Sequence, residues 1–164
     1  MNIDPPSLRN LPALLARNAA EDSERTFLAF PGGELSRGEI WERAQRIASG
    51  LVALGLQKGD RVAIMLDNGP EFIEAWFGVA TAGLIEVPLN PGMGSERLLH
   101  AMLNSDAAAV VVDGRYLDQF TELQDWLPSL RIAVTVGAAA ETALGTVELA
   151  SLRTSAISEL PAVA

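Results

Sequence analysis

The sequence predicts an α/β fold with a mostly parallel sheet flanked by helices. Short apolar runs rich in Val, Ile and Ala alternate with helical segments of about ten residues, the pattern of repeated β-α-β units. The run 62–66 is apolar at every position, as in a strand buried on both faces. Gly55 and Gly83 end two of the expected helices, because glycine adopts left-handed backbone at low cost.

The first elements are a hairpin and a helix. Strand 26–30 meets the turn Pro31-Gly32-Gly33, and Glu34-Leu35 forms the brief second arm. Ser36 and Glu39 have the spacing of a capping box, which satisfies N–H groups at a helix start. The helix that follows carries one apolar stripe at helical spacing, made of Ile40, Ala44, Ile47, Leu51 and Leu54.

The next unit contains an unusually apolar helix. Strand 61–66 follows the turn Lys58-Gly59-Asp60, and Asn68 with Glu71 repeats the capping spacing around Pro70. Apolar residues then surround helix 70–82 on nearly all sides: Phe72, Ile73, Trp76, Phe77, Val79 and Ala80. Such a helix requires cover from its own domain or from a partner. We therefore expect a homo-oligomer, or a monomer that binds a hydrophobic dye strongly.

The alternation of strands and helices then repeats, and it weakens beyond Gly137. Strand 84–88, loop 89–94, helix 95–104 and strand 108–113 are followed by a helix around 116–127 and strand 131–136. We expect helix 95–104 to point four side chains inward, Leu98, Leu99, Met102 and Leu103. Beyond Gly137 the chain is rich in Ala and Gly, with a short helix around 147–152. Residues 1–152 are thus expected to form one α/β domain, and residues 153–164 a linker or frayed tail.

Composition narrows the classes of function. The chain has 164 residues and is 49% hydrophobic, enough for a real core, and its 21 acidic against 12 basic residues give a net charge of −9. This acidic balance argues against nucleic acid or an anionic membrane as a partner. There is no cysteine, no signal-peptide pattern and no run of about 20 apolar residues that a membrane span requires. A soluble cytoplasmic protein is expected.

Five sets of residues are candidate sites of chemistry. Gly92-Met93-Gly94 begins like a dinucleotide fingerprint, with Asp113 at the distance of a ribose ligand, but Arg97 replaces the third glycine. A flexible strand-to-helix loop is the favoured interpretation. His100, the only histidine, has Glu96 four residues before it, which is generic on a helix surface.

The other three sets also have simple structural explanations. Lys58 lies in a turn, where solvated lysines are ordinary. Asp67-Asn68 follows a buried strand, where open α/β sheets collect ligands, although helix capping explains Asn68 equally well. Glu21, Asp22 and Glu24 resemble a solvated helix end rather than a metal site. We assign no catalytic, cofactor-binding or metal-binding residue in this chain.

Four segments nevertheless resemble the beginning of the adenylate-forming superfamily, which includes acyl-CoA synthetases, peptide-synthetase adenylation domains and luciferases. The first is residues 35–40, at the entry to the first helix, and the second is residues 55–64, which contain the Lys-Gly-Asp turn and the strand after it. The third is residues 68–72, and the fourth is Gly83 with residues 87–91. Residues 105–113 follow where the family has its next segment. The resemblance covers roughly residues 8–113, and Asn90-Pro91 leans towards acyl-CoA synthetases. Arg37 departs from the pattern, which usually has an aromatic residue there.

The resemblance implies the first subdomain of an adenylate-forming ligase N-terminal domain. Full-length members use ATP and Mg²⁺ to convert a carboxylic acid into an acyl-adenylate, and coenzyme A then displaces AMP. The phosphate loop, the adenine and Mg²⁺ motifs and the lysine of the C-terminal lid match no position here, so we expect the isolated chain to be inactive. The implied partners are the remainder of the same ligase chain and a small carboxylic acid. The alternatives are a non-catalytic α/β interaction or oligomerisation module and a small nucleotide-binding protein.

Overall fold

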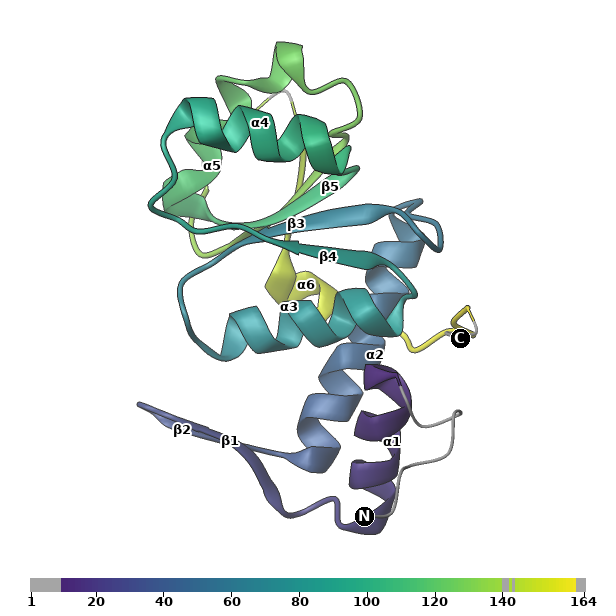
Figure 1. Cartoon of the computed structure of the whole chain (residues 1–164). Helices are drawn as coiled ribbons and strands as arrows, with labels where there is room; N and C mark the ends of the chain where they lie inside the picture. Colours follow the sequence, from purple (N-terminus) through teal and green to yellow (C-terminus); the bar gives the residue numbers. More distant parts are fainter. Residues whose placement is uncertain (1–9, 140–141, 143, 162–164) are drawn as a thin grey trace, which may run out of the picture.

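The computed structural model describes residues 10–139, 142 and 144–161 and confirms the predicted α/β fold. One sheet has five parallel strands in the order β4-β3-β5-β6-β7. The strands are β3 Arg61–Met65, β4 Ile85–Pro88, β5 Ala109–Asp113, β6 Ile132–Val136 and β7 Gly145–Glu148. The helices are α2 Arg37–Ala53, α3 Pro70–Thr81 and α6 Leu149–Leu152 on one face, and α4 Ser95–Ser105 and α5 Leu117–Thr121 on the other (Figure 1).

The central strands are buried on both faces. Val62 and Ile64 of β3 point into the core beneath α2 and α3, whereas Ala63 and Met65 point into the core beneath α4 and α5. Because successive side chains of a strand alternate between faces, a strand covered on both sides must be apolar throughout. This requirement explains the continuous apolar run that predicted β3.

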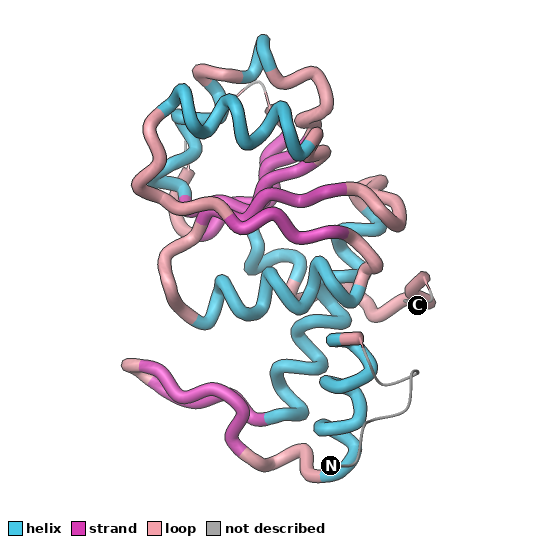
Figure 2. The backbone as a smooth tube through the Cα atoms, in the orientation of Figure 1, coloured by secondary structure: helices cyan, strands magenta, loops and turns pink. Residues whose placement is uncertain are grey.

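The N-terminal elements lie beyond α2 and α3, away from the sheet. They are α1 Leu11–Glu21 and the antiparallel hairpin of β1 Thr26–Phe30 with β2 Gly33–Ser36, which projects to one side (Figure 2). Leu15, Leu35 and Ile40 form a small core of their own, and Ile73 and Phe77 of α3 pack against it. The Phe27 ring of the hairpin meets the Phe77 ring edge to face, with centroids 5.7 Å apart. The far side of α3 is therefore covered within this chain.

The predicted helix boundaries at Ser36, Gly55 and Gly83 are confirmed. Ser36 Oγ accepts from the Glu39 backbone N–H at 3.2 Å, and the Glu39 carboxylate accepts from the Ser36 N–H at 2.7 Å, which completes the capping box. Gly55 and Gly83 have φ of 89° and 72°, in the region that favours glycine. Leu56 folds back into the core beside Leu51, as expected after such a stop.

Two predictions for α3 and α4 are wrong. Asn68 does not cap α3: the extended Gly69 is its N-cap, without a side-chain hydrogen bond, so Asn68 lies one residue before the cap and is exposed. On α4, Leu98 and Met102 are buried and Leu99 is half-buried, but Leu103 is 53% exposed. Each residue advances a helix by about 100°, so Leu103 lies beyond the buried face that Leu98 and Met102 share.

The segment expected as one helix around 116–127 is broken into three short pieces. A 3₁₀ turn, Gly114–Tyr116, precedes α5, and a second, Gln124–Trp126, follows it. Leu127 has φ −116° and ψ 69°, outside the helical region. It precedes Pro128, and a proline ring sterically disfavours helical backbone in the residue before it. Leu117, Phe120 and Leu127 are still buried beneath the sheet, as an apolar segment requires.

The C-terminal part contains a strand that was not predicted. β7 pairs in parallel with β6, and the short helix expected around 147–152 is reduced to α6. Residues 153–161 contact α2 and the core: Ser158 N donates to Ser49 Oγ at 3.0 Å, and Leu160 packs against the core. No helix in the described residues combines the length and apolar character that crossing a membrane requires.

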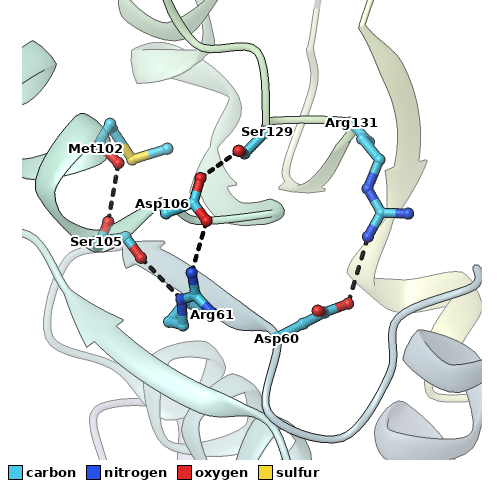
Figure 3. A network of polar contacts seen from close by, with 7 residues as sticks. All are labelled: Asp60, Arg61, Met102, Ser105, Asp106, Ser129 and Arg131. Atoms are coloured by element: carbon cyan, nitrogen blue, oxygen red, sulfur yellow. Dashed lines mark hydrogen bonds and ion pairs between the residues drawn. The ribbon is translucent and has the colours of Figure 1, made fainter.

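Charged side chains close the amino-terminal edge of the sheet (Figure 3). Arg61, at the start of β3, donates to Asp106 Oδ2 at 2.7 Å, and Ser129 Oγ donates to the other oxygen of Asp106. Arg131, which precedes β6, donates to Asp60 at 3.3 Å. Asp106 has a φ of 52°, a left-handed conformation that short polar side chains tolerate. These contacts join the loops before β3, β5 and β6.

Candidate functional site at the carboxyl edge of the sheet

The topology singles out the carboxyl ends of β3 and β5. These strands are neighbours, but the chain leaves β3 towards α3 on one face and leaves β5 towards α5 on the opposite face. Two loops that diverge in this way leave a crevice between them, and open α/β sheets bind ligands at such a switch point. Asp67-Asn68 follows β3, and Arg115-Tyr116 follows β5.

Arg115 ties the two loops together. Its Nε donates to Asp113 Oδ1 at 2.9 Å, and one Nη donates to Asp113 Oδ2 and to Asp67 Oδ2, each at 2.8 Å. The backbone N–H of Arg115 also donates to Asp113 Oδ1 at 2.9 Å, so the turn itself aims the side chain. The guanidinium lies 5.2 Å from the centre of the Tyr116 ring, in cation–π range.

The electrostatics of this group follow from those contacts. The Arg115 side-chain hydrogen bond lowers the pKa of Asp113, and burial opposes this to a smaller extent. The same bond, followed by the bond to Asp67, raises the pKa of Arg115 above its usual range. The carboxylates of Asp113 and Asp67 and the guanidinium of Arg115 carry a formal net charge of −1, and the guanidinium faces both carboxylates. The arrangement therefore braces the two loops that follow β3 and β5.

A cavity of about 370 Å³ opens beside this group. Its walls come from the ends of β3 and β4 and the start of α3, with Leu66, Asp67, Asn68, Phe72, Pro88, Leu89, Asn90 and Pro91. Asn90 Oδ1 accepts from the Gly92 N–H at 2.8 Å, which shapes the loop that leaves β4. The cavity is mixed in character, with apolar walls and one carboxylate and two amides at its rim.

The loop interpretation of Gly92-Met93-Gly94 agrees with this geometry. Gly94 is the N-cap of α4 with an ordinary φ of −76°, and a Cβ there would meet nothing within 4 Å. Asp113, the would-be ribose ligand, is engaged by Arg115. The structure therefore supplies no geometric support for a dinucleotide site on this loop.

The remaining sequence candidates are not brought together. His100 and Glu96 are exposed on α4, Lys58 is exposed in its turn, and Glu21, Asp22 and Glu24 are exposed at and after the end of α1. Within the described ranges, no three His, Asp or Glu side chains are grouped so that they could hold a metal ion.

Sequence reasoning missed a buried carboxylate. Glu74 is completely buried on α3 and contacts Arg43 of α2 and Arg153 beyond α6. The sequence contains one indication of it, a single acidic residue in the middle of a mainly apolar helix. A carboxylate in such a position stays charged only when it pairs with cations or hydrogen-bond donors. The partners lie 31 and 79 residues away in the sequence, so spacing alone could not identify them.

One family model and several known proteins match most of this chain. The family model described as AMP-binding enzyme matches residues 15–158. Crotonobetaine/carnitine–CoA ligase of Salmonella paratyphi B is 36% identical over 106 residues, which are 62% of this chain and 20% of that protein. Chalcone synthase cfoA of Aspergillus candidus is 35% identical over 107 residues, 65% of this chain and 4% of that protein.

A solved structure extends the likeness to nearly the whole chain. The apo structure of MbtA from Mycobacterium smegmatis superimposes with a TM-score of 0.79 at 31% identity, over 95% of this chain and 29% of that one. The present chain thus spans less than a third of the length of each of these three proteins.

Proposed function

This chain belongs to the AMP-binding enzyme family, and we propose that it is the first α/β layer of a longer acid–CoA ligase. The longer protein joins a carboxylic acid to coenzyme A in two steps. The acid displaces pyrophosphate from ATP and becomes an acyl-adenylate, and the thiol of coenzyme A then displaces AMP to give the thioester. The support for coenzyme A as acceptor is the 36% identity to a carnitine-type CoA ligase.

One observation carries this proposal. The family match runs from α1 through every strand of the parallel sheet to the docked segment after α6, so the likeness concerns the whole described layer and no isolated motif. The chain covers only a fifth of the CoA ligase, and the activity of that larger protein is therefore proposed for a longer polypeptide.

We propose that other parts of the longer protein bind ATP and Mg²⁺. Nε and one Nη of Arg115, at the switch point, are directed at Asp113 and Asp67. We derive no catalytic step from this layer, and we propose that its role is to support and orient the parts that bind nucleotide, thiol and acid. In keeping with this role, the isolated chain is expected to be inactive.

The domain boundary at Leu152 and a cytoplasmic location stay predictions. The contacts of residues 153–161 with α2 support a layer that continues past Leu152 before any linker begins.

A pyrophosphate-exchange assay tests the proposed function. A full-length protein that contains this chain is incubated with ATP, Mg²⁺, labelled pyrophosphate and a panel of carboxylic acids, and acid-dependent labelling of ATP is expected. Addition of coenzyme A should then release AMP together with a thioester. If no acid in a panel from acetate to long-chain and aromatic acids supports exchange, the ligase proposal is wrong, and a non-catalytic interaction module becomes the better interpretation.

A further inference from the structure

Glu74 is a buried charge that the proposed function leaves unexplained. It lies on α3 with no exposed surface, among side chains of the core. An ionised carboxylate is very unfavourable in such a place unless charged partners replace its water. Each carboxylate oxygen of Glu74 has a charged partner: Oε1 accepts from Arg43 Nη1 at 2.7 Å, and Oε2 accepts from Arg153 Nε at 2.6 Å.

The two arginines reach Glu74 from separate elements. Arg43 belongs to α2, and Arg153 is the C-cap of α6, at the start of the segment that follows the sheet. Arg153 also approaches Glu71 of α3, with Nη2 and Oε1 3.6 Å apart. Two carboxylates face two guanidiniums, so the group is electrically balanced by residues of this chain. Its effect is to connect α2, α3 and the segment after α6.

Further contacts hold that segment immediately beyond Arg153. Arg46 Nη1 donates to the Ser155 carbonyl at 3.0 Å, and the Ser158 N–H donates to Ser49 Oγ at 3.0 Å. Gly50 of α2 makes room for this approach, because a Cβ there would lie 2.8 Å from Leu152 Cδ2 and 3.0 Å from Ser155 Oγ. The segment therefore lies directly against α2.

We propose that Glu74 is a positioning residue that locks residues 153–158 onto the α2–α3 pair and so fixes the direction in which the chain leaves this layer. The ion pairs supply the anchor, and the contacts of Ser155 and Ser158 follow from it. The functional meaning rests on the proposed ligase role, in which this segment leads to the parts that bind nucleotide. The lock itself is a property of the present chain and can be tested without any substrate.

Amide hydrogen exchange measured by NMR tests the lock. Glu74→Gln keeps the volume of the side chain and removes its charge. Since a hydrogen bond to a charged group is stronger than a neutral one, we expect two amides to exchange about tenfold faster or more: that of Ser158, which donates to Ser49, and that of Ser155, which donates to the Leu152 carbonyl in the turn held by Arg153. The amides of Val111 and Val134, in the middle of the sheet, should keep their rates. Glu96→Gln, the same change on the exposed surface of α4, is the control and should alter neither pair of amides.

A second pair of variants, at Arg153, separates the effect of side-chain charge from that of side-chain shape. It also tests the proposal if Glu74→Gln fails to fold. Arg153 is partly exposed, and Arg153→Gln removes only one arm of the lock. This variant should release Ser155 and Ser158, whereas Arg153→Lys, which keeps the charge, should restore much of their protection. Three results would each overturn the proposal. The first is unchanged exchange at both amides, the second is equal exchange in the Gln and Lys variants, and the third is acceleration spread evenly over the sheet. None of these results depends on ligase activity, so the two proposals fail separately.

Discussion

At the scale of single residues, Gly55 shows how one backbone angle ends a helix. Its φ is 89°, and a Cβ at this position would meet nothing within 4 Å. The cost of a side chain here is backbone strain without a clash, so Gly55→Val is expected to lower the free energy of unfolding by about 1–3 kcal/mol. Chemical denaturation measures this. Gly94→Ser is the control: φ is −76° and serine suits an N-cap, so no loss is expected.

Arg115 and Asp113 give a prediction about pH. The pKa of Asp113 is lower in the folded chain than in the unfolded one, mainly because of the Arg115 side chain. Their pairing therefore stabilises the fold above the unfolded pKa of Asp113, and the effect is lost as the pH falls through the lower, folded-state value. In Arg115→Gln, the Asp113 pKa should rise towards its ordinary value of 3.8. Carboxyl NMR titration reports it, and an unshifted pKa would contradict the assigned contacts.

Residue-level predictions from the sequence succeeded where the cause was local. Gly55 and the Ser36–Glu39 capping box depend on backbone angles and on neighbours three residues apart, and both were found. Glu74 and the Asp67–Arg115 pair depend on contacts between distant segments, which no local pattern encodes. Asn68 matched the capping spacing, but the extended Gly69 took the cap position instead.

At the scale of elements, α2 and α3 pack closely because α3 carries a glycine at their contact. A Cβ on Gly78 would lie 2.4 Å from Ile47 Cγ2, closer than packed atoms allow. Gly78→Ala should therefore destabilise the chain by about 1–3 kcal/mol, even though alanine favours helix. Ile47→Ala alone should cost about 2–5 kcal/mol through the cavity that it leaves.

The double variant tests this packing directly. If the new methyl group at residue 78 fills space vacated at Ile47, the loss in the double variant is smaller than the sum of the two single losses. Denaturation curves of the four proteins give the coupling. Strict additivity would show that the two positions do not share a contact.

Elements with strong periodicity were predictable, and weak ones were not. The strand β3 and the helix α2 each carry an uninterrupted pattern, and their predicted bounds hold to within two residues. β7 has only four residues and follows an Ala- and Gly-rich stretch, so its pairing with β6 supplies the order that its sequence lacks. The predicted helix around 116–127 had the right apolar spacing but was interrupted before Pro128.

At the scale of the whole molecule, the prediction of self-association needs a different physical basis. The apolar ring of α3 is covered by α1, α2 and the hairpin, and none of its large side chains is exposed. The sheet instead has an edge at β4, whose outer side pairs with no strand among the described residues and on which Ile85 is 49% exposed. Edge strands of this kind pair with other chains unless a charge or a covering segment prevents it.

Ile85→Lys is expected to reduce self-association and dye binding of the chain. Light scattering coupled to size exclusion, with a hydrophobic dye assay, compares it with the parent and with Leu103→Lys. Leu103 is 53% exposed but lies on α4, away from the edge, so its variant should behave like the parent. A parent chain that is monomeric at high concentration and binds no dye would show that the edge at β4 does not drive association.

We expect this layer to support the rest of the protein without binding the nucleotide through its own residues. Calorimetric titration of the isolated chain with ATP and Mg²⁺ tests it most directly. Because Nε and one Nη of Arg115 are held by Asp113 and Asp67, and no position matches the phosphate loop of the family, we expect no measurable binding heat. Stoichiometric binding of ATP with micromolar affinity would contradict this expectation and would place a nucleotide site within this layer.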